Sequence, residues 1–220
     1  MVWLIFIFVM VASYIVQATL KSRLDKYTKV ATNLTGAQIA QMMLEQNGIH
    51  DVSITCISGT LTDHYNPQTR TVNLSQDVYN GNNLAAAAIA AHECGHVIQH
   101  ATGYAPLKLC TAAVLLVSFA NKSVQWILLL GILILQITPV MLWLGIVLFA
   151  LTVAFSFITL PVEINASQRA VAWLNNADIT DSTTTAYARD ALRWAAYTYV
   201  IAALGSLATL LYYISIARRS

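Results

Sequence analysis

Two histidines and a glutamate in the string AAHECGHVIQH have the types and spacing of a catalytic metal site. His92 and His96 are four residues apart, so on a helix both imidazoles project from one face and can bind one cation. Zinc suits two neutral imidazoles and a carboxylate, and it keeps a fourth position for water, whose pKa falls to about 7. Glu93 can take the proton of that water. The predicted chemistry is attack of activated water on a peptide carbonyl, and the alternative is a solvated polar helix face without metal.

A third protein ligand must come from another segment, and Glu163 in LPVEINASQRA is the best candidate. It stands where a long apolar stretch gives way to a polar one, so its carboxylate is expected at a membrane interface, beside the other ligands. An interfacial glutamate paired with Arg169 is the alternative. The weaker carboxylate candidates are Asp178, Asp181 and Asp190.

Hydrolysis also needs a donor for the oxyanion that develops in the transition state. His64 and Tyr65, in the turn-rich string DHYNPQT, are candidates, and water-exposed turn residues are the alternative interpretation. His100 follows His92 by eight residues, one turn too far to share the ion, and is expected on the helix surface. Residues 70–75 are expected to form an edge strand that binds extended substrate through main-chain hydrogen bonds.

The composition is that of a membrane protein. Of the 220 residues, 57% are hydrophobic and only 10% are charged. The net charge of +2 is too small, and the Lys and Arg too scattered, for a nucleic-acid surface, so no nucleic-acid partner is expected. Three cysteines without a CxxC pair indicate neither a disulfide framework nor a thiolate zinc site, and they fit a reducing, cytosol-facing compartment.

Apolar runs predict four membrane passes. Residues 1–20 are long enough for an uncleaved anchor, and the basic residues that follow place residues 21–106 in the cytoplasm. Residues 107–160 suffice for two passes, which we expect to separate at residues 136–139, with residues 121–123 as the alternative. An even number of passes returns the next polar segment to the same side.

That next polar segment, residues 161–193, carries the third-ligand helix, and residues 194–217 form the last pass. Within the cytoplasmic part, a short amphipathic helix is expected over residues 35–48, followed by a pair of strands in VSITCISG and RTVNLS. An alanine-rich helix that carries the HExxH motif should begin at Leu84 and stop at Gly103. The predicted fold is therefore mainly α: four transmembrane helices with a small α+β, zincin-like catalytic part.

The chain resembles the YugP-type neutral zinc metallopeptidases, small bacterial membrane proteins similar in plan to gluzincins of the HtpX type. The resemblance covers nearly the whole chain and rests on the strings at residues 61–81, 90–109 and 160–170. It implies one zinc ion bound by His92, His96 and Glu163, with Glu93 as general base. Gluzincin relatives commonly have an Asp four residues after the third ligand; here Ser167 stands there, so Asn165 or Ser167 is expected to orient a ligand histidine.

The expected function is a membrane-embedded zinc endopeptidase that hydrolyses membrane or membrane-proximal proteins through a zinc-activated water. It is expected in the bacterial inner membrane, with the active site facing the cytoplasm. The expected partners are the lipid bilayer and a protein or peptide substrate. The alternative is a non-catalytic scaffold with a closed structural zinc site, for which His64 or His100 would supply a fourth ligand. A third possibility places the zinc within the bilayer. No pattern indicates the oligomeric state or the cleavage specificity.

Overall fold

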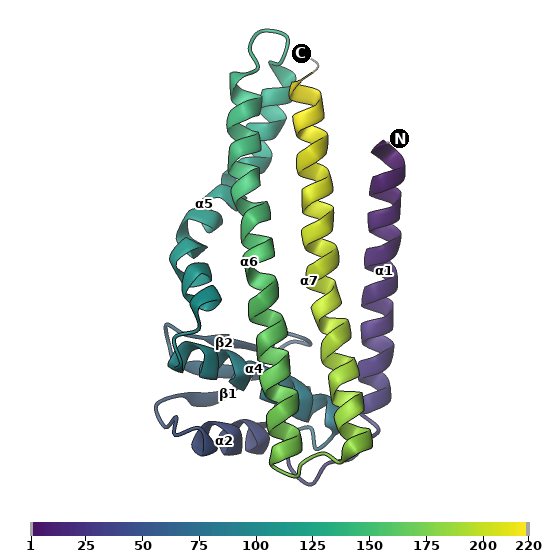
Figure 1. Cartoon of the computed structure of the whole chain (residues 1–220), viewed down its shortest axis with the longest axis vertical. Helices are drawn as coiled ribbons and strands as arrows, with labels where there is room; N and C mark the ends of the chain where they lie inside the picture. Colours follow the sequence, from purple (N-terminus) through teal and green to yellow (C-terminus); the bar gives the residue numbers. More distant parts are fainter. Residues whose placement is uncertain (1, 219–220) are drawn as a thin grey trace.

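Four long helices form an elongated bundle along the long axis of the molecule (Figure 1). The computed structural model describes residues 2–218, and the long helices are α1 (Val2–Tyr27), α5 (Ala105–Leu133), α6 (Val140–Asn176) and α7 (Ser182–Ala217). All four are long and apolar enough to cross a membrane. Large apolar side chains on their surfaces are exposed, as lipid-facing residues are expected to be; examples are Trp3, Phe8, Leu115, Trp126 and Leu133.

The break between the two middle helices lies at residues 134–139, which confirms the predicted separation at residues 136–139. The alternative at residues 121–123 is wrong, because this segment lies inside α5. Helix α6 continues unbroken through Pro161, so the apolar stretch and the segment that carries Glu163 are one helix. Similarly, the last apolar stretch belongs to a helix that already begins at Ser182. How much of α6 and α7 lies within lipid stays a prediction.

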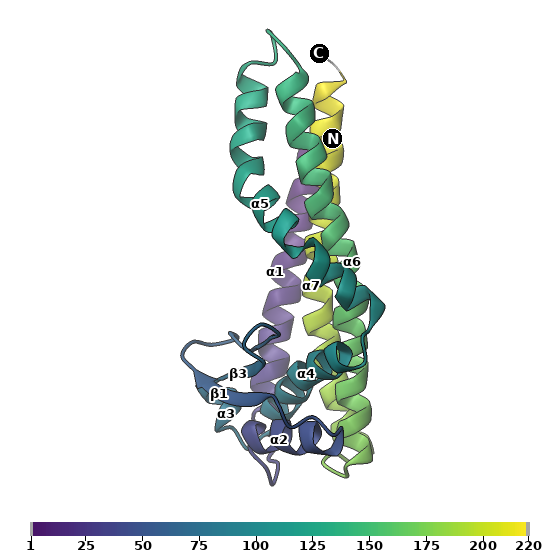
Figure 2. The ribbon, with the colours of Figure 1, turned by 90° about the vertical axis from the view of Figure 1, so that its left-hand side faces the viewer.

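The remaining elements gather at one end of the bundle, beside the loop that joins α6 to α7 (Figures 1 and 2). The helices there are α2 (Gly36–Gln46), α3 (Gln76–Tyr79) and α4 (Leu84–Ala101). Both longer helices were predicted, and both begin at a side-chain cap: Thr35 accepts from the Gln38 amide, and Asn83 from the Ala86 amide. Helix α4 ends before Gly103, whose φ of +64° suits glycine.

A small sheet of three strands replaces the predicted strand pair. The strands are β1 (Ser53–Ile57), β2 (His64–Asn66) and β3 (Thr71–Ser75), in the order β1-β3-β2. β3 pairs in parallel with β1 and antiparallel with β2, so it is the central strand, and the prediction that residues 70–75 form an edge strand is wrong. The expectation of a turn at His64 is also wrong, because a tight hairpin at residues 67–70 folds β2 back onto β3.

Helix α4 lies across the lower ends of α6 and α7, between them and the sheet (Figure 2). Its alanines are almost fully buried and let neighbouring helices approach closely, and its core contacts include Met43, Leu74 and Leu174. A second contact fixes α1 against α7: the Tyr27 hydroxyl donates to Asp190 at 2.7 Å. Helix α4 is thus surrounded by α1, α2, the sheet, α6 and α7.

Candidate metal centre

The side chains of His92, His96 and Glu163 converge between α4 and α6. Nε2 of His92 lies 3.4 Å from Oε2 of Glu163, and Nε2 of His96 lies 3.8 Å from Oε1. The three potential ligand atoms all lie within 4.8 Å of one another. Ligands at zinc bond lengths in a tetrahedron are about 3.3 Å apart, so a small contraction would accommodate the ion. The donor set, two imidazoles and one carboxylate, fits zinc.

Close packing of the two helices makes this convergence possible. A Cβ added at Gly95 would lie 2.7 Å from the backbone oxygen of Ala166, so only glycine fits at this crossing. Ala166 is less than one helical turn after Glu163, and Gly95 stands between the two histidines on α4. The close contact therefore sets the distance between the carboxylate and the imidazoles.

A chain of hydrogen bonds orients His96. Nε2 of the buried Gln99 donates to the Val162 carbonyl at 2.8 Å and to Oδ1 of Asn165 at 3.0 Å. Because a carbonyl can only accept, the amide orientation of Gln99 is fixed and its Oε1 must accept from Nδ1 of His96, 3.1 Å away. Nε2 of His96, which faces Glu163, then carries the free lone pair that a metal requires.

Ser167 plays the corresponding part for the other histidine. Its hydroxyl lies 3.1 Å from Nδ1 of His92, and when it accepts from that nitrogen, Nε2 is left unprotonated toward Glu163. Asn165 does not touch a ligand; it acts through Gln99, and it also accepts from Arg169 at 2.8 Å. The alternative in which Glu163 pairs with Arg169 is therefore wrong.

Glu93 lies beside the ligand cluster and outside it, under strand β2. Its side chain is buried, with 8% of the residue exposed, and Oε2 accepts from the Tyr65 backbone amide at 3.0 Å. Burial raises the pKa of this carboxyl to about 7, and the negative charges of Glu163 and Asp63 add to that shift. The charge of His96, when that ring is protonated, and the Tyr65 hydrogen bond act in the opposite direction. A carboxyl with such a pKa is suited to accept and return a proton near neutral pH.

The other predicted residues lie around the centre without joining it. His64 is exposed, and its ring nitrogens lie 2.8 Å from the Thr62 carbonyl oxygen and 3.3 Å from Nδ2 of Asn73. The Tyr65 hydroxyl pairs with Nδ1 of His100 at 2.9 Å. Within residues 2–218, neither His64 nor His100 belongs to the ligand cluster. The weaker carboxylate candidates also lie outside it: Asp178, Asp181 and Asp190.

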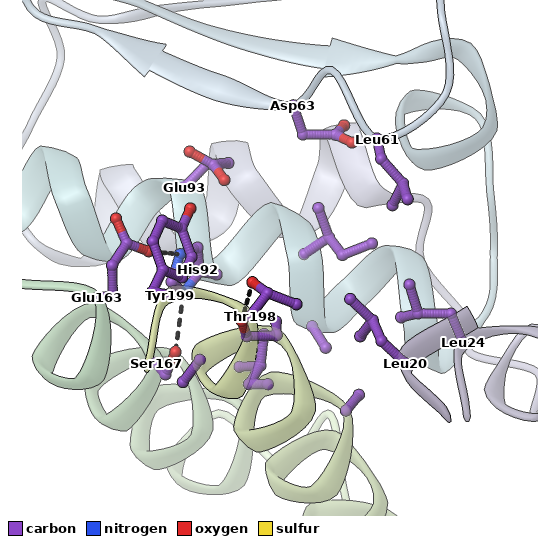
Figure 3. Close-up of a pocket in the computed structure, with 16 residues that line it drawn as sticks. Leu20, Leu24, Leu61, Asp63, His92, Glu93, Glu163, Ser167, Thr198 and Tyr199 are labelled. Carbon is purple, nitrogen blue, oxygen red and sulfur yellow. Dashed lines mark hydrogen bonds and ion pairs between the residues drawn. The ribbon is translucent and has the colours of Figure 1, made fainter. Parts of the chain in front are cut away.

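Two cavities meet at the centre. The first, of about 260 Å³, is bordered by α1, α4, α6 and α7, and the second, of about 300 Å³, by β2, α4, α5, α6 and α7. Both are lined by Asp63, His92, Glu93, Glu163 and Tyr199. The Tyr199 hydroxyl lies beside the Glu163 carboxylate (Figure 3). No sequence pattern singled out this tyrosine, which stands in an apolar stretch.

Gln99 was also missed, although its position offered a signal. It follows His96 by three residues on the same helix, within reach of that imidazole. Cys94 lies inside the motif but faces the core: its thiol contacts the Ala40 carbonyl oxygen, and burial raises its pKa. Like Cys56 and Cys110, it is a free cysteine.

Two histidines four residues apart on one helix, a carboxylate from a second helix and a buried glutamate beside them are typical of zinc metallopeptidases. Comparison with known families agrees: the model described as "Putative neutral zinc metallopeptidase" matches residues 2–218, and the chain belongs to this family. The "Putative membrane protease YugP" of Bacillus subtilis (strain 168) is 39% identical over 219 residues, covering 97% of this chain and 96% of that protein. No solved structure matches the chain.

Proposed function

We propose that this protein is a membrane-bound zinc endopeptidase that cleaves membrane or membrane-proximal proteins. The observation that carries the proposal is the convergence of His92, His96 and Glu163, with the buried carboxyl of Glu93 beside them. The family assignment supports zinc and peptide-bond hydrolysis. A closed structural site would need a fourth protein ligand and would give Glu93 no role.

Each residue has a defined task in this proposal. A zinc ion held by the three ligands would polarise the attacking water and the scissile carbonyl. The Glu93 carboxylate, held in place by the Tyr65 amide, accepts a proton from the water and delivers it to the leaving amine. The Tyr199 hydroxyl, beside Glu163 and open to both cavities, donates a hydrogen bond to the developing oxyanion. Tyr199 thus takes the role that the sequence assigned to His64 and Tyr65.

The cavities favour an apolar substrate segment. The wall between α1 and α4 is formed by Leu20, Leu24 and Ile89, and Leu192 of α7 faces it. The other cavity is lined by the more polar β2 residues His64 and Tyr65. A peptide lying across the centre would place an apolar segment toward α1 and a more polar segment beside the sheet. Such a path suits the juxtamembrane part of a membrane protein.

We place the centre on the cytoplasmic side of a bacterial inner membrane. The basic residues Lys21, Lys26 and Lys29 lie in or just after the last turns of α1, at the same end of the bundle as α4. Basic residues collect on the cytoplasmic side of a span. The position of α4 at one end of the bundle, beside the α6–α7 loop, favours an interfacial centre over one at mid-bilayer.

The proposal is tested with purified full-length protein, its Glu93→Gln variant and a Glu45→Gln control, which removes an exposed carboxylate from α2. Each is assayed for zinc content and for cleavage of casein and of membrane proteins. We expect Glu93→Gln to retain zinc and to lose activity by about 10²-fold or more, while Glu45→Gln matches the parent. Equal cleavage by the Glu93→Gln variant would refute the proposal. Comparing membrane proteomes of cells with parent and variant then identifies the substrates.

A further inference from the structure

A third, larger cavity lies between α6 and α7, on the lower part of the two helices. It measures about 680 Å³. Its α6 wall includes Ile164, Gln168 and Asn175, and its α7 wall includes Arg189, Arg193 and Tyr197. Helices α6 and α7 lie side by side along this length (Figure 1). We call this cavity the α6–α7 groove.

The groove carries uncompensated positive charge. Arg189 and Arg193 are four residues apart on α7, so the two guanidinium groups project from one face, where like charges repel. Among residues 2–218, neither arginine pairs with a carboxylate or hydrogen-bonds to another side chain, and no Asp or Glu lines the groove. An anion between the two would relieve their repulsion and accept charge-assisted hydrogen bonds from both.

The polarity of the groove changes along its length. Tyr197 follows Arg193 by four residues and so lies on the same face of α7 as the two arginines. Its ring packs edge-on against Trp194, with 5.3 Å between the ring centroids. Trp and Tyr side chains mark the membrane–water interface. Ile164 and Val200 lie at this end of the groove, whereas Gln168, Asn175 and the arginines lie toward the aqueous end. From the membrane end to the aqueous end, the groove lining is therefore apolar, then aromatic, then basic. This order matches the acyl chains, the glycerol region and the phosphate of a phospholipid.

We propose that the α6–α7 groove is a binding site for an anionic phospholipid, whose phosphate lies between Arg189 and Arg193 and whose acyl chains pass Ile164 and Val200. The charge complementarity favours an anionic head group over a zwitterionic one. The site is separate from the peptidase chemistry and does not depend on it. It does share Ser167, Leu192 and Ala196 with the cavity at the metal centre, so a bound lipid contacts the residue that orients His92.

The test uses full-length protein carrying Glu93→Gln in nanodiscs that contain equal amounts of phosphatidylglycerol and phosphatidylcholine. Native mass spectrometry after transfer to detergent measures which lipid stays bound. We expect retained phosphatidylglycerol to fall about tenfold in the double variant Arg189→Gln/Arg193→Gln, because two charge-assisted contacts are lost. Retention should recover partly in Arg189→Lys/Arg193→Lys.

The matched control is Lys21→Gln/Lys29→Gln, which removes two exposed positive charges from the same end of the bundle, outside the groove. It lowers general attraction to an anionic bilayer equally, so retention equal to that of the arginine double variant would overturn the proposal. A third variant, Ala172→Trp, fills the groove while leaving both arginines, and it should also lose phosphatidylglycerol. Circular dichroism and gel filtration confirm that each variant is folded.

A last arm separates the lipid from soluble anions. Thermal unfolding in detergent is followed with phosphatidylglycerol, phosphatidylcholine, inorganic phosphate or glycerol phosphate added. Stabilisation by phosphatidylglycerol alone supports the proposal. Equal stabilisation by inorganic phosphate, or equal retention of both lipids, contradicts it, as does a protein partner that occupies the groove in place of lipid.

Discussion

Gly95 of α4 packs directly against the backbone oxygen of Ala166 on α6, and a methyl group on Gly95 would lie 2.7 Å from that oxygen. This contact holds α4 against α6 at the level of the metal ligands. It also explains why a small residue stands between the two histidines, a position that the zinc chemistry itself leaves open.

Gly95→Ala should therefore separate the two helices and move Glu163 away from the histidines. We expect a loss of about 1–3 kcal/mol in the free energy of unfolding and a reduced zinc content after dialysis. Gly205→Ala is the control, because its new methyl would meet only a methyl group of the Val9 side chain. Unchanged zinc content in Gly95→Ala would show that the crossing does not set the ligand geometry.

Glu163→Gln tests the third ligand directly. Losing the charged ligand should weaken zinc binding so that the ion is removed by a mild chelator, while Asp77→Asn, at an exposed position on α3, should bind zinc like the parent. Zinc that binds only the folded parent should stabilise it by about 2.7 kcal/mol at a free concentration of 100 times the dissociation constant, and its melting temperature should rise accordingly. A Glu163→Gln protein with the same zinc-dependent melting shift would contradict the ligand assignment.

Gln99→Met keeps the volume of this buried side chain but removes the acceptor for Nδ1 of His96. We expect zinc affinity to fall about 10- to 100-fold, as is usual when the partner of a ligand histidine is lost. Gln41→Met, on the exposed face of α2, is the control. Competition with a chromophoric chelator measures both affinities, and equal values would assign Gln99 a packing role only.

Tyr199→Phe removes one hydroxyl from the edge of both cavities. If this hydroxyl stabilises the oxyanion, kcat should fall by about 10²- to 10³-fold with KM and zinc content nearly unchanged. Tyr14→Phe, at an exposed position on α1 outside both cavities at the centre and outside the α6–α7 groove, is the control. A higher KM or a lower zinc content, without the loss in kcat, would instead show that Tyr199 positions the zinc ligands.

The parts of the fold that were predictable from sequence are those with local signals. The capped helix after Thr35, the alanine-rich helix of His92 and His96 and the break before Pro139 all follow from caps, spacing and apolar length. The convergence with Glu163 was anticipated from the order of the membrane passes, since an even number of passes returns the chain to one side.

What could not be predicted depends on contacts between distant segments. Strand β2 has three residues, too few for an alternation pattern, and its pairing with β3 removed the free edge expected there. Tyr199 reaches the centre only because α7 packs on α6, and no local pattern marks this position. Gln99 differs: its spacing from His96 was a readable signal.

Helix α6 carries exposed apolar residues and Glu163 in one unbroken helix, residues 140–176. Its neighbour α4 packs on α6 and is also held by α2 and the sheet. A thinner or thicker bilayer changes the tilt of a spanning helix through hydrophobic mismatch. Such a change in tilt would act on the Gly95–Ala166 crossing, and through it on the distance between the carboxylate of Glu163 and the imidazoles on α4.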